Sequence, residues 1–223
     1  MRFAAIETST DWCSVALWRD GELAGIEERA GQRHGELALP MLERLLTAAR
    51  LTAADLDAVA FGAGPGSFTG LRIACGIAQG LAFARGLPVL GVSSLEAMAE
   101  ECGAPRVVAC LDARMGEVYY SALEKRGARW EEVVPAQCVA PAAAPRPPGD
   151  GWVGCGNGFA ALIADPGAMG LRSCYPEIHP GAAAIARLAA PRLAAGEGVD
   201  AGEAVPRYLR DKVALTTEER GHR

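Results

Sequence analysis

The feature that most constrains this chain is a glycine-rich turn, GPGSFTGLR at residues 64–72, placed between two apolar segments. Residues 58–61 before the turn predict a buried strand, and residues 73–83 after it predict an apolar helix rich in small residues. Glycine permits tight turns and close approach of a neighbouring backbone, and Ser67 or Thr69 can cap the helix. The turn is therefore either a phosphate cradle at a helix N-terminus or a tight corner of the fold.

The turn does not match the P-loop of nucleotide-binding proteins. The spacing from Gly66 to Gly70 is one residue short, and Leu71 stands where a lysine would follow the glycine. Arg72 could neutralise a phosphate, but it could equally be an exposed helix residue or contact a partner. Both interpretations of the turn stay open at this point.

Composition narrows the class of protein. Half of the 223 residues are hydrophobic and 22% are charged, so the chain can bury a core. The net charge of −5 argues against a protein that grips nucleic acid unaided, since such binding depends on clustered Lys and Arg. The basic residues are scattered, apart from a loose group at Arg207, Arg210 and Lys212.

Cysteine usage points to a reduced protein. The seven cysteines are odd in number, none forms a Cys-x-x-Cys pair, and several stand in apolar runs. The first predicted strand begins at Arg2, and no apolar run of membrane-spanning length occurs. We expect a cytoplasmic chain without a leader or a membrane anchor.

Strand and helix patterns alternate along the first half. They predict strands over 2–7, 13–19, 22–29, 57–63 and 88–92, and a helix over 37–49 in which Pro40 either lies in the first turn or causes a kink. Thr52 and Asp55 have the spacing of a capping box. Ser93 or Ser94 caps a further helix that ends near Gly103.

The pattern starts again after Pro105. A strand over 106–112 ends in Asp112, and a turn through Gly116 leads to a strand over 117–123, as residues 2–19 do around Glu7. The fold is therefore expected to be α/β, with two similar domains over 1–104 and 105–223. Later residues predict an exposed Pro-rich loop over 141–151, helices over 159–164 and 182–195, and a frayed end.

Few residues are candidates for catalysis or for binding a cofactor or a metal ion. Glu7, Asp11 and Asp112 stand at strand ends or in turns, where facing domains could bring them around a magnesium ion, although such acids also cap turns. A second glycine turn at Gly154 and Gly156 is a weak candidate for cofactor binding. His34 lacks a histidine four residues later, where Ala38 stands, so no metal site is expected. No protease constellation is visible.

A surface for a partner is a further possibility. Small residues recur along the helix after the turn, and the 37–49 helix shows more apolar surface than one sheet face needs. Close packing within the chain is the alternative. The small residues are Gly70, Ala74, Gly76, Gly80 and Ala84.

Together, four segments resemble the TsaB family, formerly called YeaZ. They are IETST at 6–10, GPGSFTGLR at 64–72, DARMGEVY at 112–119 and PRYLR at 206–210, which match in order over essentially the whole chain. The resemblance implies two domains of the actin/Hsp70/sugar-kinase (ASKHA) type. It also implies a role in making threonylcarbamoyladenosine beside the anticodon of tRNAs, as a non-catalytic relative of TsaD, whose His-x-x-x-His metal site has no match here.

The resemblance further implies the partners. TsaB supports TsaD as a heterodimer, the ATPase TsaE docks on that pair, and tRNA is met only through the complex, which uses ATP and magnesium. The chain itself would need no cofactor. Family members also form homodimers through two helices, which by position are those over 37–49 and 68–83. The expected interface residues are Leu37, Met41, Leu42, Leu45, Phe68, Leu71, Arg72, Cys75 and Gly76.

Two rival functions remain. The first is an ATP-dependent phosphotransferase of the same fold that uses Glu7, Asp112 and the turn over 154–158. The second is a metallopeptidase, which would need a metal site that the sequence does not show.

Overall fold

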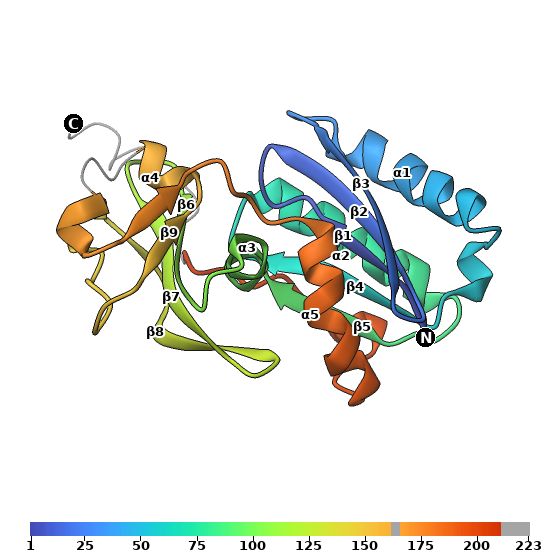
Figure 1. Cartoon of the computed structure of the whole chain (residues 1–223). Coiled ribbons are helices and arrows are strands. Elements are labelled where there is room, and N and C mark those ends of the chain that lie inside the picture. Colours follow the sequence, from blue (N-terminus) through green and yellow to red (C-terminus); the bar gives the residue numbers. More distant parts are fainter. Residues whose placement is uncertain (162–165, 211–223) are drawn as a thin grey trace.

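Two five-stranded sheets form the two halves of the molecule (Figure 1). The computed structural model describes residues 1–161 and 166–210. The strands of the first sheet are β1 (Arg2–Glu7), β2 (Trp12–Arg19), β3 (Glu22–Arg29), β4 (Ala58–Gly64) and β5 (Val89–Ser93). Those of the second are β6 (Arg106–Asp112), β7 (Val118–Arg126), β8 (Arg129–Val139), β9 (Val153–Cys155) and β10 (Ser173–Tyr175).

The two sheets have the same topology. The first runs β3-β2-β1-β4-β5 and the second β8-β7-β6-β9-β10. In each, the first three strands in sequence pair antiparallel. The fourth strand pairs in parallel with the first, and the fifth pairs in parallel with the fourth. The duplication predicted from two strand–turn–strand units is confirmed, and the fold is the expected α/β type.

Helices cover both faces of the first sheet. α1 (His34–Ala48) and α2 (Phe68–Phe83) pack on the face that Ala4 and Ile6 of β1 point into. α5 (Ala182–Ala194) packs on the other face, with Phe3 and Ala5. Alternate residues of β1 thus serve two separate cores, which is the period-2 pattern of a sheet covered on both sides.

α5 comes from the second half of the sequence but packs on the first sheet (Figure 1). The sequence-based division at residue 104 groups it with the second half instead. Its periodicity marks an apolar helix, but periodicity does not say which sheet the helix covers. α3 (Ser94–Cys102) lies between the sheets and contacts β4 and β5 of the first and β6, β7 and β9 of the second.

Short elements complete the second half. They are α4 (Asn157–Ala161) and the 3-10 turns at Pro141–Ala143, Pro166–Met169 and Ala201–Glu203; another, Ala53–Asp55, lies in the first half and has the predicted capping box. The strands β8, β9 and β10 were not predicted, because β8 is mostly half-exposed and β9 and β10 have three residues each. None of the helices in the described part of the chain is long and apolar enough to cross a bilayer.

Most residues of the Pro-rich loop over 141–151 are exposed, as predicted, but the loop is anchored to the second sheet. Pro147 is buried, the Tyr120 hydroxyl donates to the Pro145 carbonyl at 2.6 Å, and the Trp152 indole N–H donates to the Pro148 carbonyl at 2.9 Å. Buried Tyr and Trp side chains need such acceptors, so they hold the loop on the second sheet. The predicted frayed end and the last part of the 159–164 helix lie outside the described residues.

Candidate functional site

The glycine-rich turn is a tight corner of the fold. Its Ser67 accepts a hydrogen bond from the Gly70 N–H at 3.3 Å and so caps α2. The Ser67 N–H donates to the Ser9 carbonyl at 2.7 Å, and the Thr8 hydroxyl donates to the Gly70 carbonyl at 2.7 Å. A Cβ at Gly70 would overlap the Thr8 carbonyl oxygen, so only glycine fits there.

A cleft of about 710 Å³ opens beside this corner, between the two halves. Residues 9–11 and 65–71 line it from the first half, and residues 111–115 and Asn157 from the second. Residues 207–210 complete the lining. The turns after β1 and β6 therefore face each other across the cleft. They follow the strands that occupy the same position in the two sheets.

The segment over residues 204–210, here called the strap, joins the halves at the cleft. The Arg207 N–H donates to the Ala63 carbonyl at the end of β4 at 2.6 Å. The Ala204 carbonyl accepts hydrogen bonds from Cys75 and Gln79 of α2 at 3.3 and 3.0 Å. In the second half, the Arg210 guanidinium pairs with Glu117. The strap thus contacts β4 and α2 of the first half and the turn before β7 of the second half.

An aromatic cluster stands at the mouth of the cleft, made of Phe68, Arg72 and Tyr208. The Arg72 guanidinium lies 3.9 Å from the centre of the Phe68 ring, and its Nε donates to the Tyr208 hydroxyl at 3.1 Å. The two rings are 5.4 Å apart. All three side chains are exposed. Sequence analysis found both motifs that supply them, but not that residues 136 positions apart would meet.

The carboxylates that reach the cleft are already paired with arginines. Asp11 lies 3.9 Å from both Arg29 and Arg114. Asp112 accepts a hydrogen bond from the Arg114 N–H at 2.7 Å and pairs with its guanidinium at 3.4 Å. These acids therefore act first as caps and ion-pair partners of the turn over 112–116.

Of the four weak cofactor candidates, the structure places only Asp112 at the cleft. Glu7 is 1% exposed and lies beneath it. Gly154 packs against Leu171 and Phe159, and Gly156, at φ +108°, packs against the Cys110 carbonyl. Both glycines are buried and serve close packing within the second half. Their role in binding a cofactor stays a prediction, and the structure shows them as packing residues.

Glu7 is held in the core by hydrogen bonds. The Ser9 N–H donates to its Oε1 at 2.5 Å, and the Ser94 hydroxyl at the start of α3 donates to its Oε2 at 3.3 Å. Burial raises the pKa of the Glu7 carboxyl, and these hydrogen bonds offset only part of that effect. Its carboxylate packs against Gly62, away from Asp11 and Asp112, so the three acids do not form one ion site.

His34 begins α1, at the helix N-terminus where the sequence predicts it, and its side chain is buried. One ring nitrogen, Nε2, lies 2.8 Å from the Thr10 carbonyl and ties the helix to the turn after β1. Over residues 1–161 and 166–210, no three His, Cys, Asp or Glu side chains are grouped so that they could hold a metal ion.

The expected interface residues divide into two groups. Five are at most 7% exposed in this chain, so they offer a partner little surface: Met41, Leu42, Leu45, Leu71 and Cys75. The apolar faces of α1 and α2 both pack against the same face of the first sheet. Leu37 is half-buried, and Phe68, Arg72 and Gly76 are exposed.

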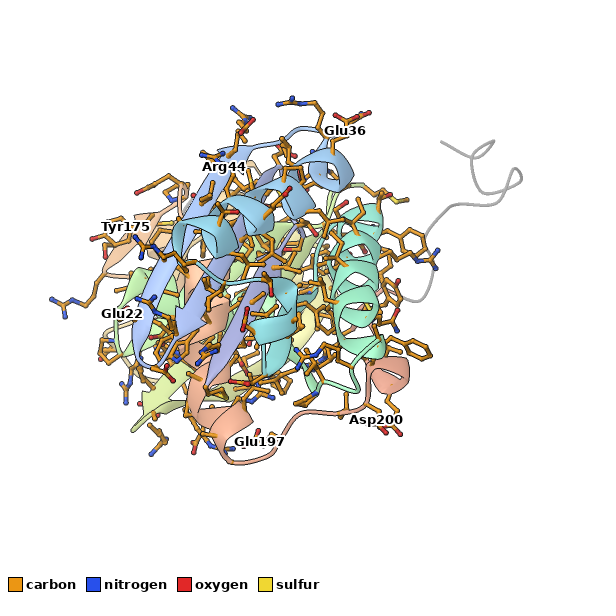
Figure 2. All side chains as sticks on the ribbon, turned by 90° about the vertical axis from the view of Figure 1, so that its right-hand side faces the viewer. Glu22, Glu36, Arg44, Tyr175, Glu197 and Asp200 are labelled. Atoms are coloured by element: carbon orange, nitrogen blue, oxygen red, sulfur yellow. The ribbon has the colours of Figure 1, made fainter. Side chains whose placement is uncertain are left out.

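The surface that α2 leaves open carries small and aromatic residues. We call it the α2 outer face: Phe68, Arg72, Gly76, Gly80 and Phe83, all exposed. Nothing lies within 4 Å of a Cβ built on Gly76 or Gly80, and Phe83 is 79% exposed. On α1, by contrast, Glu36 and Arg44 project outward from the helix (Figure 2). Apolar surface is open on both helices, since Leu39 of α1 is 48% exposed.

Comparisons with known proteins give a consistent result. Residues 26–151 match the family model described as TsaD, tRNA N6-adenosine threonylcarbamoyltransferase. The chain is 38% identical to the tRNA threonylcarbamoyladenosine biosynthesis protein TsaB of Escherichia coli, with 96% of each chain covered.

Two solved structures from Pseudomonas aeruginosa are also similar. One is YeaZ, with a TM-score of 0.86 and 38% identity over 93% of this chain and 99% of that one. The other is an uncharacterized protein with similarity to peptidase YEAZ, with a TM-score of 0.88 and 37% identity over 94% of this chain and 99% of that one.

Proposed function

The chain belongs to the TsaB (YeaZ) family, and we propose that it serves tRNA threonylcarbamoyladenosine biosynthesis as a non-catalytic partner of a TsaD-like transferase. The observation that carries the proposal is the match to TsaB over 96% of both chains, which includes the glycine-rich turn and the strap. The proposal places the chain in the cytoplasm, with tRNA.

The side chains at the cleft support a non-catalytic role. Asp11 and Asp112 are paired with Arg114, and His34 is occupied with the Thr10 carbonyl. The described acids and histidines offer no ready-made metal centre. In this proposal the assembled complex, and not this chain, uses ATP and magnesium.

The α2 outer face supports a partner role. A soluble helix gains nothing from exposed glycines in its interior, and each costs about 0.5–1 kcal/mol against alanine. Gly76 and Gly80, one turn apart, leave a flat strip between Phe68 and Phe83, where a second helix could approach closely. We propose that this strip receives either the TsaD-like subunit or a second copy of this chain, and that a TsaE-like ATPase docks on the heterodimer.

Reconstitution tests the proposal. This chain and its TsaD and TsaE homologues, all from one organism, are combined with ATP, magnesium, threonylcarbamoyl donor and unmodified tRNA. Omitting this chain should abolish modified adenosine, and adding it back should restore the yield. If the modification proceeds equally well without the chain, the proposed role is wrong.

The cleft itself favours one second candidate, an ATP-dependent phosphotransferase. Its volume of about 710 Å³ and its position beside the N-terminus of α2 suit a nucleotide. Calorimetry with Mg-ATP discriminates: micromolar binding with turnover by the isolated chain would favour the phosphotransferase over the partner subunit.

A further inference from the structure

Two cysteines from different halves of the chain meet where α3 ends. Cys102 is the last residue of α3, and Cys155 is the last residue of β9 in the second sheet. The Cys155 Sγ lies 3.8 Å from the Met98 carbonyl, one turn before Cys102 on the same helix. Residues four apart on a helix share a face, so Cys102 lies beside the Cys155 thiol. Cys102 also packs against the buried cluster that contains Cys155.

The cysteines of the second sheet lie on its two opposite faces, and only one of them faces Cys102. Cys155 points to the side that α3 covers, together with its β6 neighbour Ala109. Cys110 and Cys174 belong to the cluster on the opposite side of the same sheet, with Trp152 and Phe159. The sheet therefore separates these two thiols from Cys102, and Cys155 is the thiol that faces it.

Cys102 also has the character of an attacking thiol. The interaction with the Cys155 thiol lowers the pKa of Cys102 to about 7, and the interaction with Cys102 raises the pKa of Cys155. Cys102 is half-buried and thus open to a small oxidant, whereas Cys155 is buried. Thiolates, not thiols, react with peroxides, so reaction begins at Cys102.

The chain can move enough to close the bond. Cys102 is followed by Gly103, an exposed residue at φ +71° with nothing packed against it, and then by the connection to β6. A helix end next to such a residue can shift without disturbing the core. A disulfide needs that freedom, because its sulfurs stand about 2 Å apart, closer than in a hydrogen bond.

We propose that Cys102 and Cys155 form a reversible disulfide that senses hydroperoxides and fixes α3 to the second sheet. The Cys102 thiolate attacks the peroxide, cleaves the O–O bond and becomes a sulfenic acid, while the leaving oxygen takes a proton to give water or an alcohol. The Cys155 sulfur then attacks the Cys102 sulfur, and a second water leaves with the thiol proton. Peroxide is reduced, and two thiols are oxidised.

The disulfide would affect the cleft because α3 connects the two sites. The helix begins at Ser94, which hydrogen-bonds Glu7 beneath the cleft, and ends at Cys102. A covalent link at its far end would hold the first half to the second through a helix that already contacts both sheets. The disulfide therefore restrains the relative position of the halves that line the cleft.

Peptide mapping of the intact chain tests the pairing. The folded protein is treated with hydrogen peroxide, its free thiols are blocked with N-ethylmaleimide, and disulfide-linked peptides are identified by mass spectrometry. We expect one dominant Cys102–Cys155 link, the loss of two alkylatable thiols, and full recovery after dithiothreitol. Oxidation of Cys102 to sulfinic acid with Cys155 still free, or a dominant link between other cysteines, would overturn the proposal.

Variants sharpen the test. Cys155→Ser should abolish the link and let Cys102 proceed to sulfinic acid, whereas Cys174→Ser, a change on the opposite face of the same sheet, should leave the link intact. Hydrogen exchange of α3 in the wild-type chain gives a second readout, with slower exchange expected after oxidation and reversal by dithiothreitol. Equal exchange in both states would contradict the proposed restraint.

Discussion

Glycines within one helix of this protein have opposite roles. Gly70, in the first turn of α2, is buried and faces the Thr8 carbonyl so closely that no side chain fits. Gly80, ten residues later, is exposed and has open space around it. Sequence analysis placed both in one stripe of small residues. Only their surroundings separate a glycine required by the fold from one left free at the surface.

Alanine at these two positions should therefore change stability in opposite directions. Gly70→Ala is expected to lower the free energy of unfolding by about 1–3 kcal/mol, because its Cβ forces the 8–11 turn away from α2. Gly80→Ala should raise it by about 0.5–1 kcal/mol, since alanine restricts the unfolded chain and favours the helix. Urea unfolding of both variants measures this; the same sign for both would refute the assignment.

Glu7, a weak candidate for cofactor binding, is a buried acid whose ionisation affects the stability of the fold. Its raised pKa arises from burial, so the folded chain binds this proton more tightly than the unfolded chain, whose carboxyl titrates at about 4.5. As the pH rises from that value through the folded pKa, ionisation in the core costs stability. The charge of Glu7 therefore works against folding at neutral pH.

Glu7→Gln should remove this pH dependence. The amide keeps an acceptor for the Ser9 N–H and offers a donor to Ser94, while no charge is buried. We expect the variant to gain free energy of unfolding relative to wild type at about pH 8 and to lose that gain at about pH 4. Denaturant titrations at both values decide it, with Glu43→Gln on the exposed side of α1 as a control that should change little.

At the scale of elements, the periodicity of apolar residues predicted where the helices lie, but not which of their residues the rest of the chain buries. The apolar spacing over 37–49 correctly predicted α1, and the small residues after the glycine turn correctly predicted α2. The excess of apolar surface suggested an interface on both. In the structure, Leu45 is buried against the first sheet, where α1 and α2 share one face, and Leu71 is buried beside the cleft. The spacing of apolar residues cannot show how much of a helix its own chain covers.

A test of the proposed interface must therefore use the α2 outer face. Gly76→Arg adds a long charged side chain where nothing lies within 4 Å, so the variant should fold normally yet lose association with the TsaD homologue or with itself. Leu45→Asp should instead unfold the chain, with a loss above the roughly 2–5 kcal/mol typical of core truncation. Light scattering gives the assembly mass and circular dichroism the fold.

The outcomes separate clearly. A folded Gly76→Arg variant with unchanged assembly mass would rule out the α2 outer face as the interface. A folded but monomeric Leu45→Asp variant would show that the core described around α1 is wrong.

At the scale of the whole molecule, the chain passes between the halves more than once. The connection from β10 to α5 returns to the first sheet, and His179 fixes it there. The imidazole stacks on Trp12 at 4.5 Å between ring centres, and its Nε2 lies 3.1 Å from the Glu27 carboxylate. Burial alone would lower the pKa of His179, but the hydrogen bonds to Glu27 and to the Glu177 carbonyl raise it overall.

This contact should make stability depend on pH near neutrality. A histidine whose folded pKa lies above its unfolded value of about 6.5 stabilises the fold fully below that pH, and the stabilisation is lost as the pH rises through the folded pKa. Thermal unfolding of wild type should thus shift downward between about pH 6 and pH 8. Glu27→Gln should flatten this dependence; an unchanged profile would show that the pair contributes nothing.

The sequence by itself determined the α/β class, the duplicated strand order, most helices and the family, because these follow from local periodicity, turn residues and short motifs. The tertiary structure decided which candidate residues are buried and which reach the cleft or the surface. It buried Glu7, Gly154 and Gly156, turned the glycine-rich segment into a corner clamped by Thr8 and Ser9, and brought the strap to the cleft. Contacts between residues far apart in sequence set burial, and no local pattern encodes them.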